Sequence, residues 1–445
     1  MISKIKKYYI QTFGCQMNER DTEVLSGMLK KMGYQKSDNR EKSDIILFNT
    51  CCVREKAENK VLSYLGELKD LKSQNPDLII GVCGCMVQQK GMTDLIRRSA
   101  PHVELLFGTH NIHELPDLIE NILASRNPQI SVWNSEGEIK ENLPSDRESP
   151  FKALVNITYG CNNYCTYCIV PYVRGKERSR LPQHIVQEIN SLVNEGVIEV
   201  MLLGQNVNSY GKDFTENKVD FADLLEMVND IEGIERIRYM TSHPRDFSDK
   251  LIKTIASCNK VSKHFHLPVQ AGSNNILKKM NRGYTRESYL ELIQKIRQYH
   301  PNAVITTDII VGFPGETEDD FLETLDLVEK VRFDSAFTFI YSKRTGTPAA
   351  KFKDQVPMEV KKERIQRLNE QINVISHEIN QDYLHKKVEV LVEGPSKTNE
   401  NILTGRTDGN KTVIFSGDIK HIGKIVSVLI TETQTWILKG KIEEI

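Results

Sequence analysis

Short apolar runs alternate with amphipathic segments along the first 133 residues. The runs YYIQTF, DIILFN, LIIGVC and VELLFG have the length of buried strands. Between them, apolar positions recur at helical spacing in residues 19–32, 53–74, 88–99 and 111–124. Such alternation predicts right-handed βαβ units. We therefore expect an α/β domain with a doubly wound parallel sheet over residues 1–133.

A second alternating block follows a polar, charged stretch at residues 134–149, which is typical of a linker. The block spans residues 150–375 and holds six strand candidates: ALVNIT, VIEVMLLG, RIRYMT, KHFHLPV, AVITTDIIVG and AFTFIY. Helical patterns lie between them at residues 182–194, 219–230, 273–281, 285–299 and 318–330. Six β/α units are fewer than the eight that close a full barrel. The pattern predicts a partial (β/α)6 barrel with its functional residues on the loops after the strands.

The last part of the chain changes to closely spaced strands. A charged amphipathic helix pattern at residues 357–382 leads into VEVLVEG, ILTGRTD, TVIFSG and IVSVLITETQTWILKGKI. Asp408-Gly409 is a hairpin turn signal between two of these runs. The pattern predicts a small β-barrel as a third domain, over residues 376–445.

Composition narrows the class of protein. Of the 445 residues, 39% are hydrophobic and 27% charged, which excludes gross disorder. No apolar run reaches the roughly 18 residues that a membrane span needs, and the first residues lack the apolar core of a signal peptide. We therefore expect a cytoplasmic protein with no membrane partner. The formal net charge of −1 gives no support to a nucleic-acid partner, although a local basic patch is compatible with it.

The nine cysteines favour metal or redox chemistry, because the chain is long and nothing indicates export. Cys161, Cys165 and Cys168 form a CxxxCxxC array just after the first strand of the second block. Three thiolates at this spacing can bind three irons of a 4Fe-4S cluster and leave the fourth iron open to a substrate. The alternative is a structural zinc site with a distant fourth ligand, such as Cys258 or a histidine.

Three further cysteines, Cys15, Cys51 and Cys85, each follow a predicted strand of the first domain. The carboxyl ends of parallel strands converge on one crevice, so these thiols should meet there and bind a second cluster with an open iron. The alternative is three buried cysteines that pack as small hydrophobic residues. We interpret Cys52, Cys83 and Cys258 as packing residues, although Cys52 and Cys83 lie close enough in sequence to compete as ligands.

The CxxxCxxC array, with Tyr167 before its last cysteine and six β/α units behind it, resembles the radical S-adenosylmethionine superfamily. The resemblance implies that the open iron binds S-adenosylmethionine, which is cleaved to methionine and a 5′-deoxyadenosyl radical. It also implies that residues on consecutive strand ends contact S-adenosylmethionine. A single Gly or Ser after a strand is more often part of a plain turn. The prediction therefore depends on such residues following several consecutive strands. The predicted contacts are Tyr167, Gly204, Gln205, Ser242, Gln270, Val311 and Gly312.

Motifs along the whole chain resemble the radical S-adenosylmethionine methylthiotransferases: TFGCQMN, NTCCVR, GCNNYCTYCIVPYVRGKERSR, SHPRDF, HLPVQAGS, DIIVGFPGET, YSKRTGTPAA and GRTDGNKTV. The resemblance implies a methylthiotransferase domain, a radical domain and a C-terminal TRAM domain, with two 4Fe-4S clusters and two molecules of S-adenosylmethionine. Three branches modify C2 of N6-isopentenyladenosine beside the tRNA anticodon, threonylcarbamoyladenosine at the same place, or an aspartate of a ribosomal protein. GCQMN, NTCCVREKAENK and GRTDGNK favour the first branch, with Cys52 standing where that branch often has Ser.

A tRNA substrate requires basic side chains, and two runs supply them. One lies after the cluster loop and the other near residue 280, although charge runs are usually solvated faces. The resemblance also implies that the TRAM domain binds RNA, and the reaction needs a sulfur source and a reduced electron donor such as flavodoxin or ferredoxin. A metal-containing RNA-binding protein without catalysis is the alternative of another class. The predicted RNA contacts are Arg174, Lys176, Arg178, Arg180, Lys278, Lys279, Arg282 and Arg286.

Overall fold

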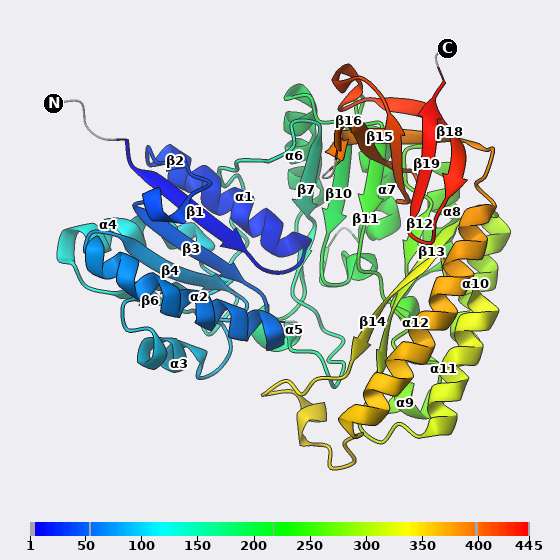
Figure 1. Ribbon diagram of the computed structural model, residues 1–445, viewed down its shortest axis with the longest axis horizontal. Helices are drawn as coiled ribbons and strands as arrows, with labels where there is room; N and C mark the ends of the chain where they lie inside the picture. The colour runs from blue at the N-terminus through cyan, green and yellow to red at the C-terminus, as the bar shows by residue number, and fades with distance from the viewer. Residues whose placement is uncertain (1–4, 53–54, 217, 397–398, 444–445) are drawn as a thin grey trace.

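A six-stranded parallel sheet forms the N-terminal domain in the computed structural model, which describes residues 5–52, 55–216, 218–396 and 399–443 (Figure 1). Helices α1 and α4 pack on one face of the sheet, and α2 and α3 pack on the other. The predicted doubly wound sheet is therefore confirmed. In sheet order, the strands are β2 (Gln35–Lys36), β1 (Lys7–Thr12), β3 (Ile45–Thr50), β4 (Ile79–Gly84), β5 (Leu105–Phe107) and β6 (Gln129–Ser131). The helices are α1 (Gln16–Lys31), α2 (Glu55–Gln74), α3 (Met92–Ser99) and α4 (Leu115–Ser125).

The central strands form where the apolar runs are continuous. Every residue of β3 and β4 is buried, as expected for parallel strands covered by helices on both faces. The edge strands β2 and β6 were not predicted, because two or three residues are too few to show a period. Residues 53 and 54, the start of the predicted helix 53–74, lie outside the described residues.

Six parallel strands form the predicted partial barrel of the central domain. They make two three-stranded sheets, which the bridge between Ile237 and Val261 joins. Helix α8 is an additional element, and a short hairpin and helix α5 follow the first barrel strand. The barrel strands are β7 (Lys152–Asn156), β10 (Glu199–Leu203), β11 (Arg236–Tyr239), β12 (His264–His266), β13 (Val304–Val311) and β14 (Ser335–Ile340). The other elements are β8 (Thr158–Tyr159), β9 (Arg178–Ser179), α5 (Val170–Val173), α6 (Pro182–Asn194), α7 (Phe221–Asn229), α8 (Asp249–Ser257), α9 (Asn274–Lys279), α10 (Arg286–Tyr299) and α11 (Glu318–Val331).

The long helix α12 (Met358–Gln381) runs along the partial barrel and leads into a closed five-stranded barrel at the C-terminal end (Figure 1). Alternating apolar residues of the five strands form the small core of this C-terminal barrel. In barrel order, the strands are β15 (Lys387–Ser396), β16 (Asn399–Thr407), β17 (Thr412–Ser416), β19 (Ile437–Ile442) and β18 (Ile425–Thr433). Among the described residues, no helix has the length and apolar character needed to cross a membrane.

The β16–β17 hairpin of the C-terminal barrel closes the base of the partial barrel. Arg238 of β11 donates to the carbonyl oxygens of Thr407 (2.7 Å) and Asp408 (2.9 Å), which lie at the hairpin tip. Asp408 also accepts the backbone amide of Lys263 at 2.9 Å. These contacts lie where the barrel strands begin, so the opposite end, where the strands finish, remains for the functional site.

Candidate functional site

Three neighbouring strands bring Cys15, Cys51 and Cys85 to one edge of the N-terminal sheet. Strands β1, β3 and β4, which precede these cysteines, lie side by side in the sheet. A Cβ added at Gly14 would lie 2.8 Å from the Cβ of Cys51, and the Cys85 amide donates to the Thr50 carbonyl at 2.8 Å. The tight backbone packing therefore places the three thiols around one crevice.

Gly84 is the residue that lets the loop of Cys85 approach β3. Its φ is +91°, and an added Cβ would lie 2.5 Å from the Thr50 carbonyl oxygen. We expect Gly84→Ala to lower the free energy of unfolding by about 2–4 kcal/mol, since it combines left-handed strain with an overpacked contact. Chemical denaturation measures this. Gly33→Ala is the matched control, because Gly33 has a φ of +89° and no atom lies within 4 Å of a Cβ added there. Equal losses in the two variants would contradict the contact argument.

Cys85 lies beside a second thiol, Cys52, and the buried Arg174. The Cys52 thiol, which hydrogen-bonds to Cys85, and the nearby Arg174 guanidinium lower the pKa of Cys85 to about 6. Nε of Arg174 donates to Sγ of Cys85 at 3.2 Å, and its Nη2 donates to Asp21 Oδ2 at 2.8 Å. The crevice therefore favours a thiolate at Cys85, the form that binds iron.

The CxxxCxxC loop is folded by its own backbone. The Cys161 amide donates to the Gly175 carbonyl at 3.1 Å, and the Cys168 amide donates to the Cys165 carbonyl at 2.9 Å. Burial raises the pKa of Cys161 to about 11 and that of Cys168 to about 12. Free thiols therefore hold their protons here, and metal binding would release them. Nη1 of the buried Arg282 donates to Sγ of Cys165 at 3.3 Å.

The donor chemistry of both triads fits iron–sulfur clusters. Across the described part of the chain, no three His, Cys, Asp or Glu side chains are grouped closely enough to hold a single metal ion. A 4Fe-4S cluster binds each thiolate through a different iron, so its ligand sulfurs stand farther apart than the ligands of one ion. Cys258, the suggested fourth zinc ligand, is instead buried in the core of the central domain, beside Glu226 and Lys263.

Helix α5, which follows the CxxxCxxC loop, lies against the cysteines of the N-terminal domain. Cys52 and Cys85 of the N-terminal domain pack directly against Ile169 and Val173, which follow the CxxxCxxC loop. Thr109, after β5, donates to the Val173 carbonyl at 2.7 Å. The N-terminal crevice therefore faces the end of the partial barrel at which its strands finish.

The residues predicted to contact S-adenosylmethionine follow successive barrel strands at the end occupied by the cysteine loop. Oε1 of Gln205 accepts the Gly160 amide at 2.8 Å, and its Nε2 contacts the sulfur of Met17 in α1, so this side chain also joins two domains. Oγ of Ser242 is buried and has no hydrogen-bond partner among the described residues. The Val311 side chain points into the core, which leaves only its backbone for a ligand. The set comprises Tyr167, Gly204, Gln205, Ser242, Gln270, Val311 and Gly312.

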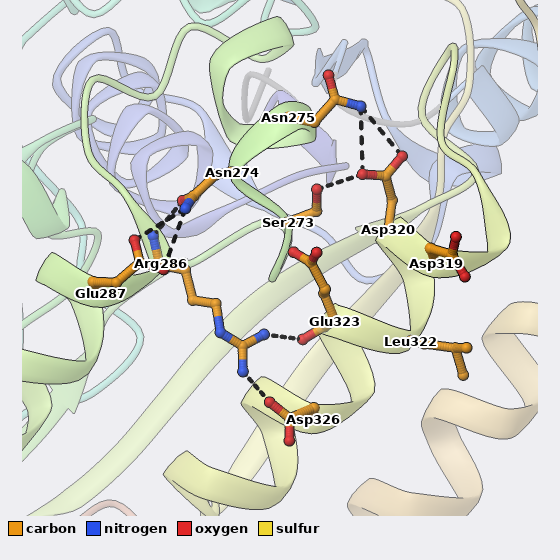
Figure 2. A pocket seen from close by; sticks show the side chains of 10 residues that line it. All are labelled: Ser273, Asn274, Asn275, Arg286, Glu287, Asp319, Asp320, Leu322, Glu323 and Asp326. Carbon is orange, nitrogen blue, oxygen red and sulfur yellow. Dashed lines mark hydrogen bonds and ion pairs between the residues drawn. The ribbon is translucent and has the colours of Figure 1, made fainter.

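Four of the predicted RNA contacts are buried arginines with internal partners. Arg174 and Arg282 bond to the cysteine loops as described, and Nη2 of Arg180 donates to Glu141 of the linker at 2.5 Å. Arg286 bonds to Asp326 and to the Glu323 carbonyl in a pocket lined by acidic side chains (Figure 2). These four arginines are buried and form hydrogen bonds or ion pairs within the protein, so their role as RNA contacts stays a prediction.

The other four predicted RNA contacts are at least partly exposed. Arg178 and Lys279 are half-buried and donate to backbone carbonyls, whereas Lys176 and Lys278 are exposed. The backbone of α9, which carries Lys278, is bonded to the cysteine loop through Thr166. Of the eight predicted RNA contacts, Lys176 and Lys278 are therefore the exposed ones.

The barrel lumen holds polar and aromatic side chains that were not predicted. Asp308 of β13 lies opposite Phe337 of β14 in the register, 3.5 Å from Nε2 of His266. The Phe337 ring is 54% exposed and meets the His266 ring edge-on at 6.2 Å. Ile305 and Ile309 pack outward against the helices, so alternation turns Asp308 inward. The period-2 pattern of HFHL, TTDII and AFTFI was the signal that would have found these residues.

Three family models match the chain, each within one predicted domain. The uncharacterized protein family UPF0004 matches residues 7–108, the radical SAM superfamily residues 155–328, and the TRAM domain residues 381–442. Two solved structures share the fold. The radical S-adenosylmethionine methyltransferase TsrM from Kitasatospora setae has a TM-score of 0.55 and 13% identity, and covers 78% of this chain and 75% of its own. The cobalamin-dependent S-adenosylmethionine radical enzyme OxsB has a TM-score of 0.51 and 14% identity, and covers 84% and 58%.

Curated relatives match over nearly their full length. The protein of Desulforamulus reducens is 59% identical over 98% of this chain and 95% of its own. Those of Acetivibrio thermocellus and Moorella thermoacetica are 57% and 56% identical, over 99% of this chain and 91% and 99% of their own. All three carry the name tRNA-2-methylthio-N(6)-dimethylallyladenosine synthase. The chain belongs to this family of radical S-adenosylmethionine enzymes.

Proposed function

We propose that the chain replaces the C2 hydrogen of N6-isopentenyladenosine in tRNA by a methylthio group, using one S-adenosylmethionine as radical source and another as methyl donor. The observation that carries the proposal is the packing of Cys85, one of the N-terminal triad, against Ile169 and Val173, which directly follow the CxxxCxxC loop. A reaction that joins a radical site to a sulfur site needs such proximity. The name shared by the relatives supports the choice of substrate.

The protein contributes to the reaction mainly by holding the reacting groups in position. When bound, one 4Fe-4S cluster supplies the electron that cleaves S-adenosylmethionine, and the other holds the sulfur to be transferred. Cys161, Cys165 and Cys168 would bind the first, and Cys15, Cys51 and Cys85 the second. Ile169 and Val173 exclude water between the two loops, and α5 fixes their separation. Holding the reacting groups at near-contact distance raises their effective molarity.

The adenosine has to leave the stack of the anticodon loop to reach this site. The exposed Phe337 ring offers a face on which a flipped purine can stack, beside the side chains of His266 and Asp308. The unpartnered Oγ of Ser242 and the strand-end residues are the proposed contacts for S-adenosylmethionine. We assign residues 1–133 to the sulfur site, 150–375 to the radical site and 376–445 to RNA binding. A sulfur source and a reduced flavodoxin or ferredoxin complete the proposed partners.

The deciding experiment is an anaerobic reaction of the iron-loaded protein with tRNA that carries N6-isopentenyladenosine, followed by mass spectrometry of the nucleosides. We expect a methylthio group on this nucleoside, dependent on S-adenosylmethionine and reductant. A methylthio group on threonylcarbamoyladenosine, or on the aspartate of a ribosomal protein instead, would overturn the substrate. A metal-containing RNA-binding protein without catalysis would release no 5′-deoxyadenosine.

The exposed lysines near the site give a prediction about salt dependence. Replacing Lys176 and Lys278 by Ala should weaken tRNA binding and lower the slope of log affinity against log salt by about 0.7 for each lost phosphate contact. Filter binding over a range of salt concentrations measures both. Lys69→Ala is the control, because Lys69 is exposed in the second half of α2, toward the end of the N-terminal sheet opposite the cysteines. An unchanged slope in the double variant would remove these lysines from the interface.

A further inference from the structure

Each cysteine triad has its own buried arginine. Arg174 donates through Nε to Sγ of Cys85 at 3.2 Å, and the carboxylate of Asp21 accepts its Nη2 at 2.8 Å. The side chains of Arg174 and Asp21 are only 6% and 7% exposed. This guanidinium is therefore fixed on both sides and withdrawn from water.

Arg282 occupies the corresponding position at the other triad. Its Nη1 donates to Sγ of Cys165 at 3.3 Å, its Nε to the Tyr284 hydroxyl at 3.0 Å and its Nη2 to the Pro268 carbonyl at 2.7 Å. The residue is 4% exposed and its guanidinium packs over the Tyr284 ring. No acidic side chain among the described residues bonds to Arg282, so its charge acts on the cysteine loop.

Each arginine acts on one triad. The positive charge of Arg282 favours the thiolate forms of Cys161 and Cys168, whereas that of Arg174 favours the thiolate form of Cys85. A cluster gains one negative charge on reduction, and hydrogen bonds or positive charge at its sulfurs favour that reduced state. The effect is large where water is excluded. We propose that Arg174 and Arg282 are positioning residues that raise the reduction potential of the sulfur-site cluster and the radical-site cluster, respectively.

The proposal rests on the assignment of the two triads as cluster ligands in the proposed function. Its test uses two full-length proteins that each keep one cluster, with either Cys15, Cys51 and Cys85 or Cys161, Cys165 and Cys168 replaced by Ala. Iron analysis first shows whether the remaining cluster assembles. Failure to assemble in these parent proteins contradicts the ligand assignment, whereas assembly with unchanged potentials in the arginine variants contradicts only the proposal.

Redox titration followed by electron paramagnetic resonance gives the reduction potential. Arg282→Gln should lower the potential of the radical-site cluster, with at least a tenfold smaller ratio of reduced to oxidised cluster at fixed potential, about 59 mV for one electron. Arg174→Gln should do the same at the sulfur-site cluster. As a control, each substitution is also made in the other parent protein, where it should leave the potential of the remaining cluster unchanged. Arg→Lys at either position keeps the positive charge, so the potential should lie between those of the parent protein and the Gln variant. Where a Gln variant does not load iron, the Lys variant is measured instead.

Asp21→Asn provides a test of opposite sign. The amide still accepts the hydrogen bond from Arg174, but the negative charge that offsets the guanidinium is lost. We expect the potential of the sulfur-site cluster to rise, and a purely structural role of the Arg174–Asp21 pair predicts no such rise. Equal potentials in the parent, Arg174→Gln and Asp21→Asn proteins would overturn the assignment for this cluster.

Discussion

Replacement of Cys85 by Ala is expected to abolish methylthio transfer and to lower the iron content from about eight to about four atoms per chain. Cys85 is buried and accepts hydrogen bonds from Cys52 and Arg174, and the alanine methyl group supplies no ligand atom in place of its sulfur. Release of 5′-deoxyadenosine should persist, since the CxxxCxxC loop is intact. Iron analysis and mass spectrometry of the nucleosides measure both effects.

Cys83→Ala is the control for this experiment. Cys83 lies two residues before Cys85 but packs in the core between the sheet and helices α1 and α4. The positive φ of Gly84 interrupts the alternation of the strand and separates the two thiols. We expect the Cys83 variant to keep about eight irons. If Cys85→Ala retained the full iron content and Cys83→Ala did not, the ligand set would have to be revised.

Replacement of Arg238 by Met is expected to destabilise the protein by about 3–5 kcal/mol, because it leaves Glu199 as a buried charge without its closest partner. Nε of Arg238 donates to Glu199 Oε2 at 2.9 Å, and both side chains are more than nine-tenths buried. The same arginine holds the Thr407 carbonyl of the β16–β17 hairpin at 2.7 Å. Urea denaturation followed by circular dichroism gives the free energy of unfolding.

The double variant Arg238→Met with Glu199→Gln separates the two contributions. Removing the carboxylate charge should recover a large part of the lost stability, whereas the bonds to the hairpin stay broken. A double variant as unstable as the single one would show that the hairpin contacts, and not the uncompensated Glu199, dominate the loss.

The arrangement of strands and helices was predictable because it depends on local apolar periodicity. All six barrel strands and the four long runs of the N-terminal sheet formed where the pattern placed them. The ends of strands β1, β3 and β4 then followed from parallel pairing, so the meeting of Cys15, Cys51 and Cys85 could be expected from the chain alone.

The partners of the buried arginines could not be predicted in this way. Arg174 pairs with Asp21, 153 positions away, and Arg180 pairs with Glu141 of the linker. A run of basic residues looks the same in sequence whether its charges meet RNA or a carboxylate of another domain. The inward-facing Phe337 was not predicted, although the alternation along its strand indicates which residues share a face.

The hairpin at residues 407–410 has a consequence for how the chain is made. Ribosomes deliver the N-terminal part first, and domains generally fold as units during synthesis. The carbonyl oxygens that satisfy Arg236 and Arg238 come from residues 406–408, more than 160 positions later. Until the final strands emerge, a nascent partial barrel therefore offers these guanidinium groups Glu199 but not the hairpin carbonyl oxygens. Truncation before residue 399 should leave that base open and make the released chain a target for chaperones and proteases.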